Sequence, residues 1–497
     1  RISSIGELMP INSFLYPAPS TPSFVYNVAN SLRFDSGSSD SLDRTISSSP
    51  TNPDKFTISV WVKRSKLSSE QAIIGQYSSS NFRAKIDFLA DDRIEYIQKN
   101  DGNTSANIIT TRKFRDISAW YHIVMQYDST QSTSSNRIKF YVNGTQETSF
   151  DTTSYPAQNL DGKLNQASVP LDIGQDGNSS IYFSGYMAEF VLVDGQSLDP
   201  TSFGEFNSDS PTIWQPIDVS GLTFGDDGFY LDFENSSSLG ADVSGNSNNF
   251  TVNNLTSVDQ STDTCTNNFA TCNSLDNFST GGTFSEGNLQ TQSTTSNRGI
   301  FTGTIGLSSG VWYWEVKTSA TGGNNASDQW NYIGIAGQVG AASTDNILGS
   351  SGTNSRKSHE YALQAVNGSL YNNGASAVTY GASFTEGDIL GIKLDLDNNR
   401  LYFSKNGQWA DGSGNFDESN PTGYISISDP STTESGFYFP AWGDGGVNVN
   451  KTWQLNFGGT QSFTVSSGNQ DPNGYGNFEY DTKSGYAICT KNLAEFG

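Results

Sequence analysis

The chain has few of the residues that most often carry covalent or metal chemistry. Its 497 residues include three cysteines and two histidines, His122 and His359. Cys265 and Cys272 lie close together, whereas Cys489 is distant, so disulfides cannot form the framework of a chain this long. The first two could form one bridge in an oxidising setting or remain free thiols. The scarcity of histidine argues against zinc sites and Ser–His–Asp triads.

Positive charge and long apolar runs are also scarce. Charged residues make up 16% of the chain, with 27 basic against 51 acidic side chains and a net charge of −24. Such a chain repels a phosphate backbone, so we expect no nucleic-acid partner. No apolar run reaches the length that crosses a bilayer, so we expect no membrane insertion. The first residues lack the apolar core of an export signal, which indicates either another route or a removed leader.

The residues that are abundant favour sheets over helices. There are 50 glycines, and the aromatic residues comprise 30 Phe, 22 Tyr and 9 Trp. Glycine loses too much entropy in a helix, whereas aromatic side chains suit a pleated, half-buried surface. A disordered chain would lack these aromatic residues, so the composition also argues against disorder. Together these preferences predict an all-β protein. The length allows two large sandwiches.

Alternating apolar residues predict individual strands. Phe56, Ile58 and Val60 share one face of a strand, and residues 120–127 alternate in the same way. His122 therefore falls on a strand face, where we expect a hydrogen-bonded structural histidine. Residues 137–142 end at Asn143-Gly144, a dipeptide typical of a tight hairpin turn. Residues 199–206 predict one short helix, and helix content is otherwise minimal.

The pattern divides the chain into three parts. Residues 1–30 contain four prolines and no apolar period, which predicts an extended arm that packs on its own domain or on a neighbouring subunit. A polar stretch at about residues 236–290 separates two strand-rich regions. We therefore predict two antiparallel jelly-roll β-sandwich domains in tandem, at residues 31–273 and 274–497, behind the N-terminal arm.

Two sets of motifs resemble known families. The first half resembles the concanavalin A-like, laminin-G-type sandwich through SLRFD (31–35), FTISVWVK (56–63), WYHIV (120–124), IKFYVNG (138–144) and FSGYMAEF (183–190). The second half resembles a SPRY domain through GVWYWEV (310–316), YIGIA (332–336), GDILGI (387–392), LYFSKNG (401–407) and FPAW (439–442).

The pairing of these modules in an acidic, Ser/Asn/Gly-rich chain is similar to virion proteins of tailed bacteriophages, marine ones especially. The closing stretch GYAICTKNL (485–493) is part of this likeness. The resemblance implies a fibre or host-recognition protein that is made in the host cytoplasm and incorporated into the virion. It also implies that residues 1–30 contact other virion proteins and that the chain forms a homo-oligomer.

The sequence contains no recognisable catalytic motif. Sandwich glycoside hydrolases need two carboxylates, often delivered as Glu-x-Asp-x-Glu, and that pattern is absent. Asp395 with Asp397, and Asp232 with Glu234, each supply only two acids and are explained by solvated strands or hairpins. No nucleophile elbow or phosphate-binding loop occurs. We therefore predict that the chain is not an enzyme and requires no cofactor.

Loop residues of the second half are the candidate ligand contacts. An exposed aromatic face can cover the apolar face of a sugar while nearby amides bond its hydroxyls. Trp330, Trp409 and Trp442 lie in or beside Asn/Gly/Asp-rich stretches and are the candidate sugar-binding residues, with structural packing as the alternative for each. Asp411, Asn415 and Asp417 place oxygen atoms at alternate loop positions and form a possible calcium site, with polar turn residues as the alternative.

These observations favour a host-recognition protein that binds surface glycans weakly and through many copies. The alternative is a purely structural decoration of head or tail that binds other virion proteins. A polysaccharide depolymerase is a third possibility, and it would need a buried pair of carboxylates.

Overall fold

The structure is nearly all β. The computed structural model describes residues 26–178, 180–276, 282–293, 299–320, 331–338, 348–349, 359–372, 377–445 and 451–497. In these ranges there is one α-helix, α1 (Thr490–Phe496), and none is long and apolar enough to cross a membrane. The short 3-10 turns are η1 (Ser134–Asn136), η2 (Pro200–Ser202), η3 (Ser257–Asp259), η4 (Glu286–Asn288) and η6 (Pro430–Thr432). The predicted all-β class is confirmed.

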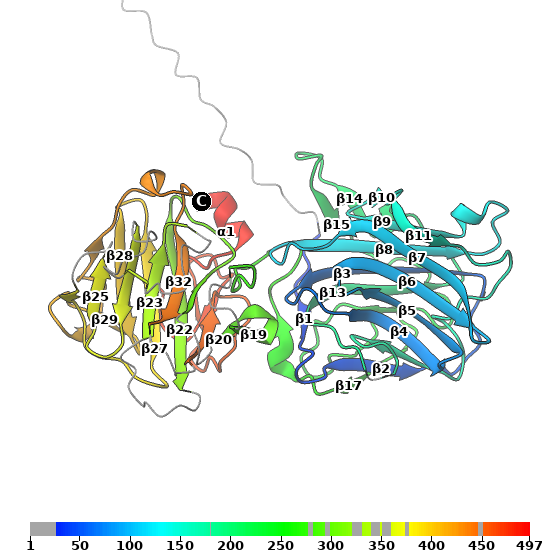
Figure 1. Ribbon diagram of the computed structural model, residues 1–497, viewed down its shortest axis with the longest axis horizontal. Helices are drawn as coiled ribbons and strands as arrows, with labels where there is room; N and C mark the ends of the chain where they lie inside the picture. Colours follow the sequence, from blue (N-terminus) through cyan, green and yellow to red (C-terminus); the bar gives the residue numbers. More distant parts are fainter. Residues whose placement is uncertain are drawn as a thin grey trace, which may run out of the picture.

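The first half forms a sandwich of two antiparallel sheets (Figure 1). In spatial order, the first sheet contains β10 (Thr145–Gln146), β9 (Ile138–Val142), β8 (Trp120–Asp128), β3 (Lys55–Arg64), β13 (Gly185–Asp194), β1 (Ser31–Phe34) and β18 (Gln260–Ser261), with β16 (Phe229–Leu231) paired to β13. The second contains β11 (Phe150–Ser154), β7 (Asn103–Lys113), β6 (Arg93–Asn100), β5 (Phe82–Phe88), β4 (Gln71–Ser79), β12 (Pro170–Ile173), β2 (Ser41–Thr45) and β17 (Thr251–Asn253).

Both faces of the first sheet are buried. Phe56, Ile58 and Val60 of β3 point into the core between the sheets, as their alternation predicts. On the opposite face, Val191 and Val193 of β13 are covered by the segment that follows β13. This segment contains Phe203, Val219 and Phe224. The first sheet thus carries apolar side chains on both sides, as sheets covered on both faces do.

The short helix predicted at residues 199–206 begins as expected, with Asp199 as its N-cap and Pro200 at its first position, but it is one 3-10 turn, η2, and its predicted end at Phe206 is wrong. The strand β14 (Gly204–Phe206) follows it and pairs with β15 (Trp214–Pro216). A Cβ atom at Gly204 would lie 2.7 Å from the Gln215 carbonyl oxygen and from the Trp214 ring. Close approach to this ring therefore requires glycine and favours the hairpin over a helix.

The second half forms another antiparallel sandwich. Its larger sheet contains β19 (Thr283–Ser285), β20 (Gln290–Gln292), β33 (Lys451–Asn456), β22 (Val311–Ala320), β27 (Ile389–Asp395), β28 (Arg400–Lys405), β29 (Gln408–Ala410) and β30 (Phe416–Glu418), with β31 (Ile425–Ser426) paired to β28. The other contains β21 (Gly299–Thr302), β32 (Phe439–Asp444), β23 (Asn331–Ala336), β24 (Glu360–Gln364), β25 (Ser369–Asn372) and β26 (Val378–Thr379). A small hairpin joins β34 (Asn469–Gln470) to β35 (Asn477–Phe478).

The last residues of the chain cover the outer face of the larger sheet. Trp312 and Trp314 of β22 point into the core, whereas Tyr313 on the other face packs against Phe478 and Cys489. Glu315, on that same face, accepts hydrogen bonds from the backbone N–H groups of residues 479 and 480 at 3.0 and 2.8 Å. A face that alternation marks as solvent-exposed is therefore buried by sequence-distant chain.

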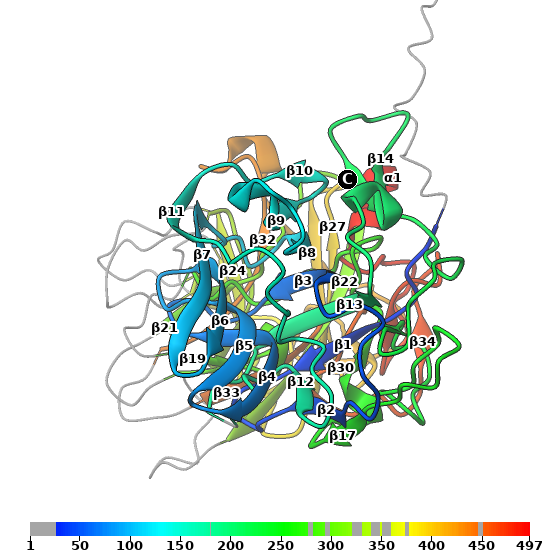
Figure 2. The same cartoon turned by 90° about the vertical axis from the view of Figure 1, so that its right-hand side faces the viewer.

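The two sandwiches lie side by side in Figure 1 and behind one another in Figure 2, which looks along the long axis of the molecule. Leu255 belongs to the first core and Phe269 already packs in the second body, a few residues before the junction predicted at 274. In the predicted arm, Val28 is buried and the Tyr26 hydroxyl bonds to Glu189 of the first body at 3.2 Å. Residues 1–25 of that arm lie outside the described residues.

Charged side chains link the bodies. The Arg33 guanidinium pairs with Asp259 and with Glu286, at 2.8 Å each. The Lys63 ammonium bonds to Asp263 at 2.6 Å and to the Phe269 carbonyl oxygen at 2.9 Å. Lys63 is 1% exposed, so removing one of its partners would leave a buried charge uncompensated.

We predict that the protein is more stable at mildly acidic than at neutral pH. Burial raises the pKa of Asp87 to about 8, and those of Asp172, Glu189 and Glu315 to about 7. In the unfolded chain these groups titrate near pH 4, so the folded state holds more protons between about pH 4 and pH 8. Stability is then highest near pH 5 and falls as the pH rises through 7, which thermal melts at each pH will measure.

A matched pair of variants separates these groups from the general effect of net charge. Glu315→Gln removes a buried titrating carboxyl, whereas Glu386→Gln removes an exposed one. The free energy of unfolding is expected to decline between pH 5 and pH 8 in the parent chain. We expect only Glu315→Gln to reduce this decline, by up to about 1.4 kcal/mol per unit of pKa shift. Identical pH profiles for both variants and the parent chain would contradict the assignment.

Candidate functional site

A cleft with aromatic walls opens between the two bodies. Its volume is about 660 Å³, within the range of about 300–1,000 Å³ that ligand pockets occupy. We call it the tryptophan cleft. The first body contributes Asn27, Trp61, Trp120, Asn143, Ile213 and Trp214, the second contributes Asn268, Tyr475, Thr490, Lys491, Ala494 and Glu495, and Cys265 lies where the chain crosses.

The tryptophans come from the outer face of the first sheet and from the hairpin that covers it. Trp61 on β3 and Trp120 on β8 point away from the core of the sandwich, and Trp214 begins β15. They are 4%, 8% and 8% exposed, so each ring forms part of a wall and does not project into solvent. Lys63, opposite Trp120 in the strand register, anchors the crossing segment beneath this wall.

His122 holds two of these rings in place. The Trp214 indole N–H donates to His122 Nδ1 at 2.9 Å, which makes Nδ1 an acceptor and leaves the ring proton on Nε2. Nε2 therefore donates to the Ser59 hydroxyl at 2.8 Å, and the imidazole stacks on Trp61 with centroids 4.6 Å apart. Burial lowers the pKa of His122 to about 3. The prediction of a hydrogen-bonded structural histidine is confirmed.

Polar groups gather at the mouth of the cleft. Lys491 of α1 bonds to Asn27 Oδ1 at 2.5 Å and lies 5.4 Å from the centre of the Tyr475 ring. Tyr475 is 37% exposed, and Thr490 and Glu495 are exposed beside it. The cleft thus combines an apolar wall with hydroxyl, amide, ammonium and carboxylate groups that are accessible from solution.

This arrangement suits binding better than hydrolysis. A glycoside hydrolase needs two carboxyl groups on either side of the scissile bond. Glu495 is the one carboxylate among the described residues that line the cleft, and no histidine reaches the cavity. A ligand with an apolar face and several hydroxyl groups matches the remaining chemistry.

The tryptophans singled out from the sequence lie elsewhere. Trp409 is 1% exposed and Trp442 is fully buried, with its indole N–H donated to Thr291 Oγ1 at 2.7 Å. Both rings are packing residues of the second body, which corrects the expectation that they contact a sugar. Trp330 falls outside the described residues.

Part of the wall of the tryptophan cleft could have been predicted from the sequence. Trp61 alternates with the core residues of β3, so its place on the outer face was readable. What covers that face was not, because Trp214 lies about ninety residues further along the chain from His122, to which it bonds.

The candidate calcium loop is closed by its own hydrogen bonds. Asp411 Oδ1 accepts from the backbone N–H groups of Ser413 and Asn415 at 2.6 and 3.0 Å, and Oδ2 accepts from the Asn415 amide at 2.9 Å. The Asn415 side chain and these backbone groups lower the pKa of Asp411 to about 2. Asp417 is exposed on β30. Among the described residues no group of three or more His, Cys, Asp or Glu could hold a metal ion.

We predict that calcium does not stabilise this loop. Both oxygens of Asp411 already accept hydrogen bonds from within the turn, as in an ordinary Asx turn. Thermal melts in EDTA and in millimolar calcium chloride are expected to coincide. A rise in melting temperature with calcium that Asp411→Asn abolishes would reinstate the site.

Comparisons with known proteins agree with this division into two sandwiches. Residues 35–200 match the family model described as the concanavalin A-like lectin/glucanases superfamily. Residues 311–423 match the model of the SPRY domain. The chain therefore contains a concanavalin A-like, laminin-G-type domain followed by a SPRY domain. No curated protein matches the sequence.

Solved structures that are similar to the chain each match part of it. The SPRY domain of human HERC1 is 18% identical, with 34% of this chain and 87% of that chain covered and a TM-score of 0.24. A SAP-like pentraxin from Limulus polyphemus is 14% identical, with 35% and 80% covered and a TM-score of 0.26. A putative carbohydrate binding protein from Bacteroides ovatus is 16% identical, with 46% and 59% covered and a TM-score of 0.32.

The cysteines offer a test of the cleft geometry. All three are free thiols; Cys265 is half-buried at the cleft, whereas Cys272 and Cys489 are buried. We predict that an alkylating reagent modifies Cys265 alone in the folded protein. The reaction will be slow because burial raises the pKa of this thiol. Peptide mass spectrometry measures the site, and earlier labelling of Cys272 or Cys489 would contradict the packing described.

Proposed function

We propose that the chain is a carbohydrate-binding protein without catalytic activity and that the tryptophan cleft is its binding site. The proposal rests on one observation: a single cleft combines a wall of three tryptophan rings with polar groups that are accessible from solution. Sugars present both an apolar ring face and hydroxyl groups, so this combination suits them. The match of the first domain to a superfamily that includes lectins supports the same class of ligand.

We further propose that the protein belongs to the virion of a tailed bacteriophage and recognises glycans on the host surface. This setting rests on the sequence resemblance described above. A chain with only 16% charged residues suits such a role, since its solubility depends little on ion pairs that salt would screen. Residues 1–30 would join the chain to other virion proteins, and several copies would raise avidity about 10²–10⁴-fold over one weak site.

Glycan arrays followed by titration of the purified chain test the proposal. Tyr475→Ala removes the exposed ring at the mouth, and we expect affinity to fall at least about fivefold, the loss of roughly 1 kcal/mol. Ala494→Trp fills the cleft from an exposed position on α1, and we expect it to abolish binding. Tyr424→Ala is the matched control: that ring is 48% exposed beneath Arg400 and lies outside the cleft.

Three outcomes would count against the proposal. Absence of binding to any glycan, together with no competition for phage adsorption, would favour a purely structural virion protein. Release of reducing sugar from a bound polysaccharide would show a depolymerase. Equal loss of affinity in Tyr424→Ala and Tyr475→Ala would place the ligand outside the tryptophan cleft.

A further inference from the structure

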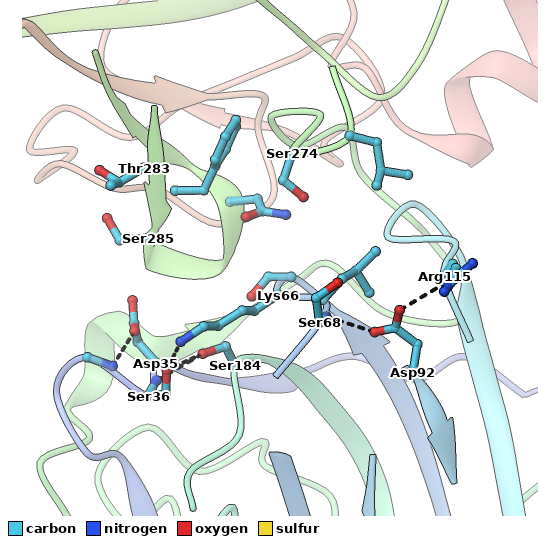
Figure 3. Close-up of a pocket in the computed structure, with 16 residues that line it drawn as sticks. Asp35, Ser36, Lys66, Ser68, Asp92, Arg115, Ser184, Ser274, Thr283 and Ser285 are labelled. Carbon is cyan, nitrogen blue, oxygen red and sulfur yellow. Dashed lines mark hydrogen bonds and ion pairs between the residues drawn. The ribbon is translucent and has the colours of Figure 1, made fainter. Parts of the chain in front are cut away.

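A second cleft opens between the bodies and has a different set of lining side chains (Figure 3). Its volume is about 800 Å³. The first body supplies residues that follow β1 and β3, and the second supplies residues of β19 and η4. Serine hydroxyls predominate, with Ser36, Ser184, Ser274 and Ser285 among them. We call it the serine cleft; it shares no lining residue with the tryptophan cleft.

The carboxylates of the serine cleft are already engaged within the protein. Asp35 accepts hydrogen bonds from the backbone N–H groups of Gly37 at 2.7 Å and Glu286 at 2.9 Å, one on each oxygen. Asp92 pairs with the buried Arg64 at 3.2 Å on one oxygen and with Arg115 at 3.0 Å on the other. Two guanidinium groups thus offset the charge of Asp92.

The groups that remain available are donors. Asn288 is 2% exposed, yet its side-chain N–H₂ group has no hydrogen-bond partner among the described residues. Lys66 is exposed, and its ammonium contacts only the Ser36 hydroxyl, at 3.2 Å, within that part of the chain. The Arg115 side chain is 57% exposed and uses its Nε atom for Asp92. A buried donor without a partner is costly, so an acceptor on a ligand would stabilise Asn288.

We propose that the serine cleft binds a saccharide that carries a carboxylate, such as a uronic acid unit. Its carboxylate would accept a charge-assisted hydrogen bond from Lys66, Arg115 on the opposite side of the cleft would donate to a second oxygen of the ligand, and Asn288 would donate to a third (Figure 3). The serine hydroxyls match sugar hydroxyl groups, and Phe284 and Leu67 supply an apolar surface for the ring. Lys66 and Arg115 balance Asp35 and Asp92 among the residues that line this cleft, so its lining has no net charge in a chain whose net charge is −24.

The inference rests on the proposed carbohydrate-binding function and adds a second site, specific for acidic sugars, that is built from separate residues. Because the two clefts share no residue, one can fail while the other holds. Binding lost in Ala494→Trp reports on the tryptophan cleft, and binding lost in Lys66→Gln reports on the serine cleft.

Calorimetric titration of the full chain with a galacturonic acid trisaccharide, its methyl ester and the free monosaccharide tests the inference. We expect the acidic trisaccharide to bind at least about tenfold more tightly than its uncharged ester, and more weakly as salt rises. Binding of the monosaccharide with equal affinity would assign the site to a single sugar acid; much weaker binding would assign it to a polymer segment.

Variants then assign that binding to the cleft. Lys66→Gln removes an exposed cation, and we expect about a tenfold loss for the acidic ligand with no change for the ester. Asn288→Asp keeps the side-chain shape but replaces the donor with a negative charge, and we expect binding to be abolished. Lys139→Gln is the control, because Lys139 on β9 does not line the cleft.

The folding of each variant is checked by its melting temperature. If Asn288→Asp does not fold, the exposed Lys66→Gln variant and the comparison of acid with ester still decide the matter. Equal affinity for acid and ester, or an acid affinity that is the same in Lys66→Gln and Lys139→Gln, would overturn the inference, as would the absence of binding at millimolar concentration.

Discussion

The architecture depends on one constraint: the first sheet is apolar on both faces and must be covered twice. One face meets the second sheet of its own sandwich, as the alternation in β3 requires. The other presents Trp61, Trp120 and Tyr186, which the β14–β15 hairpin and the neighbouring body cover between them. The crevices at the edges of this contact are the two clefts, so burial of one surface creates both candidate sites.

Buried charged side chains also fix the orientation of the first sheet relative to the second body. Arg33 and Lys63 stand on the outer face of the first sheet, and each meets an acid and a main-chain carbonyl oxygen from chain beyond residue 258. Hydrophobic burial is non-directional, whereas the buried cations Arg33 and Lys63 each require partners at fixed positions, which allows few arrangements of the two bodies. The Tyr186 hydroxyl, which donates to the Gly287 carbonyl oxygen at 2.9 Å, adds to that selection.

Local pattern was enough to predict strands, turns and the division into two sandwiches. Asn143 and Gly144 both take positive φ angles, 48° and 73°, and close the β9–β10 hairpin as the dipeptide predicts. The alternating residues of the second domain likewise form paired strands, with Leu394 of β27 opposite Leu401 of β28. The candidate sites could not be predicted, because period-2 alternation says which side chains share a face but not what covers it. Trp409 and Trp442 were assigned to loops on local composition, although neighbours distant in sequence bury them.

The anchoring of Lys63 has a mechanical consequence. Its ammonium ties β3, a central strand of one sandwich, to the residues that enter the other, through Asp263, Asn268 and Phe269. Any bending at this segment would have to separate the Lys63 ammonium from these three partners and leave a buried cation uncompensated, so the same side chain that orders β3 also opposes movement at the joint.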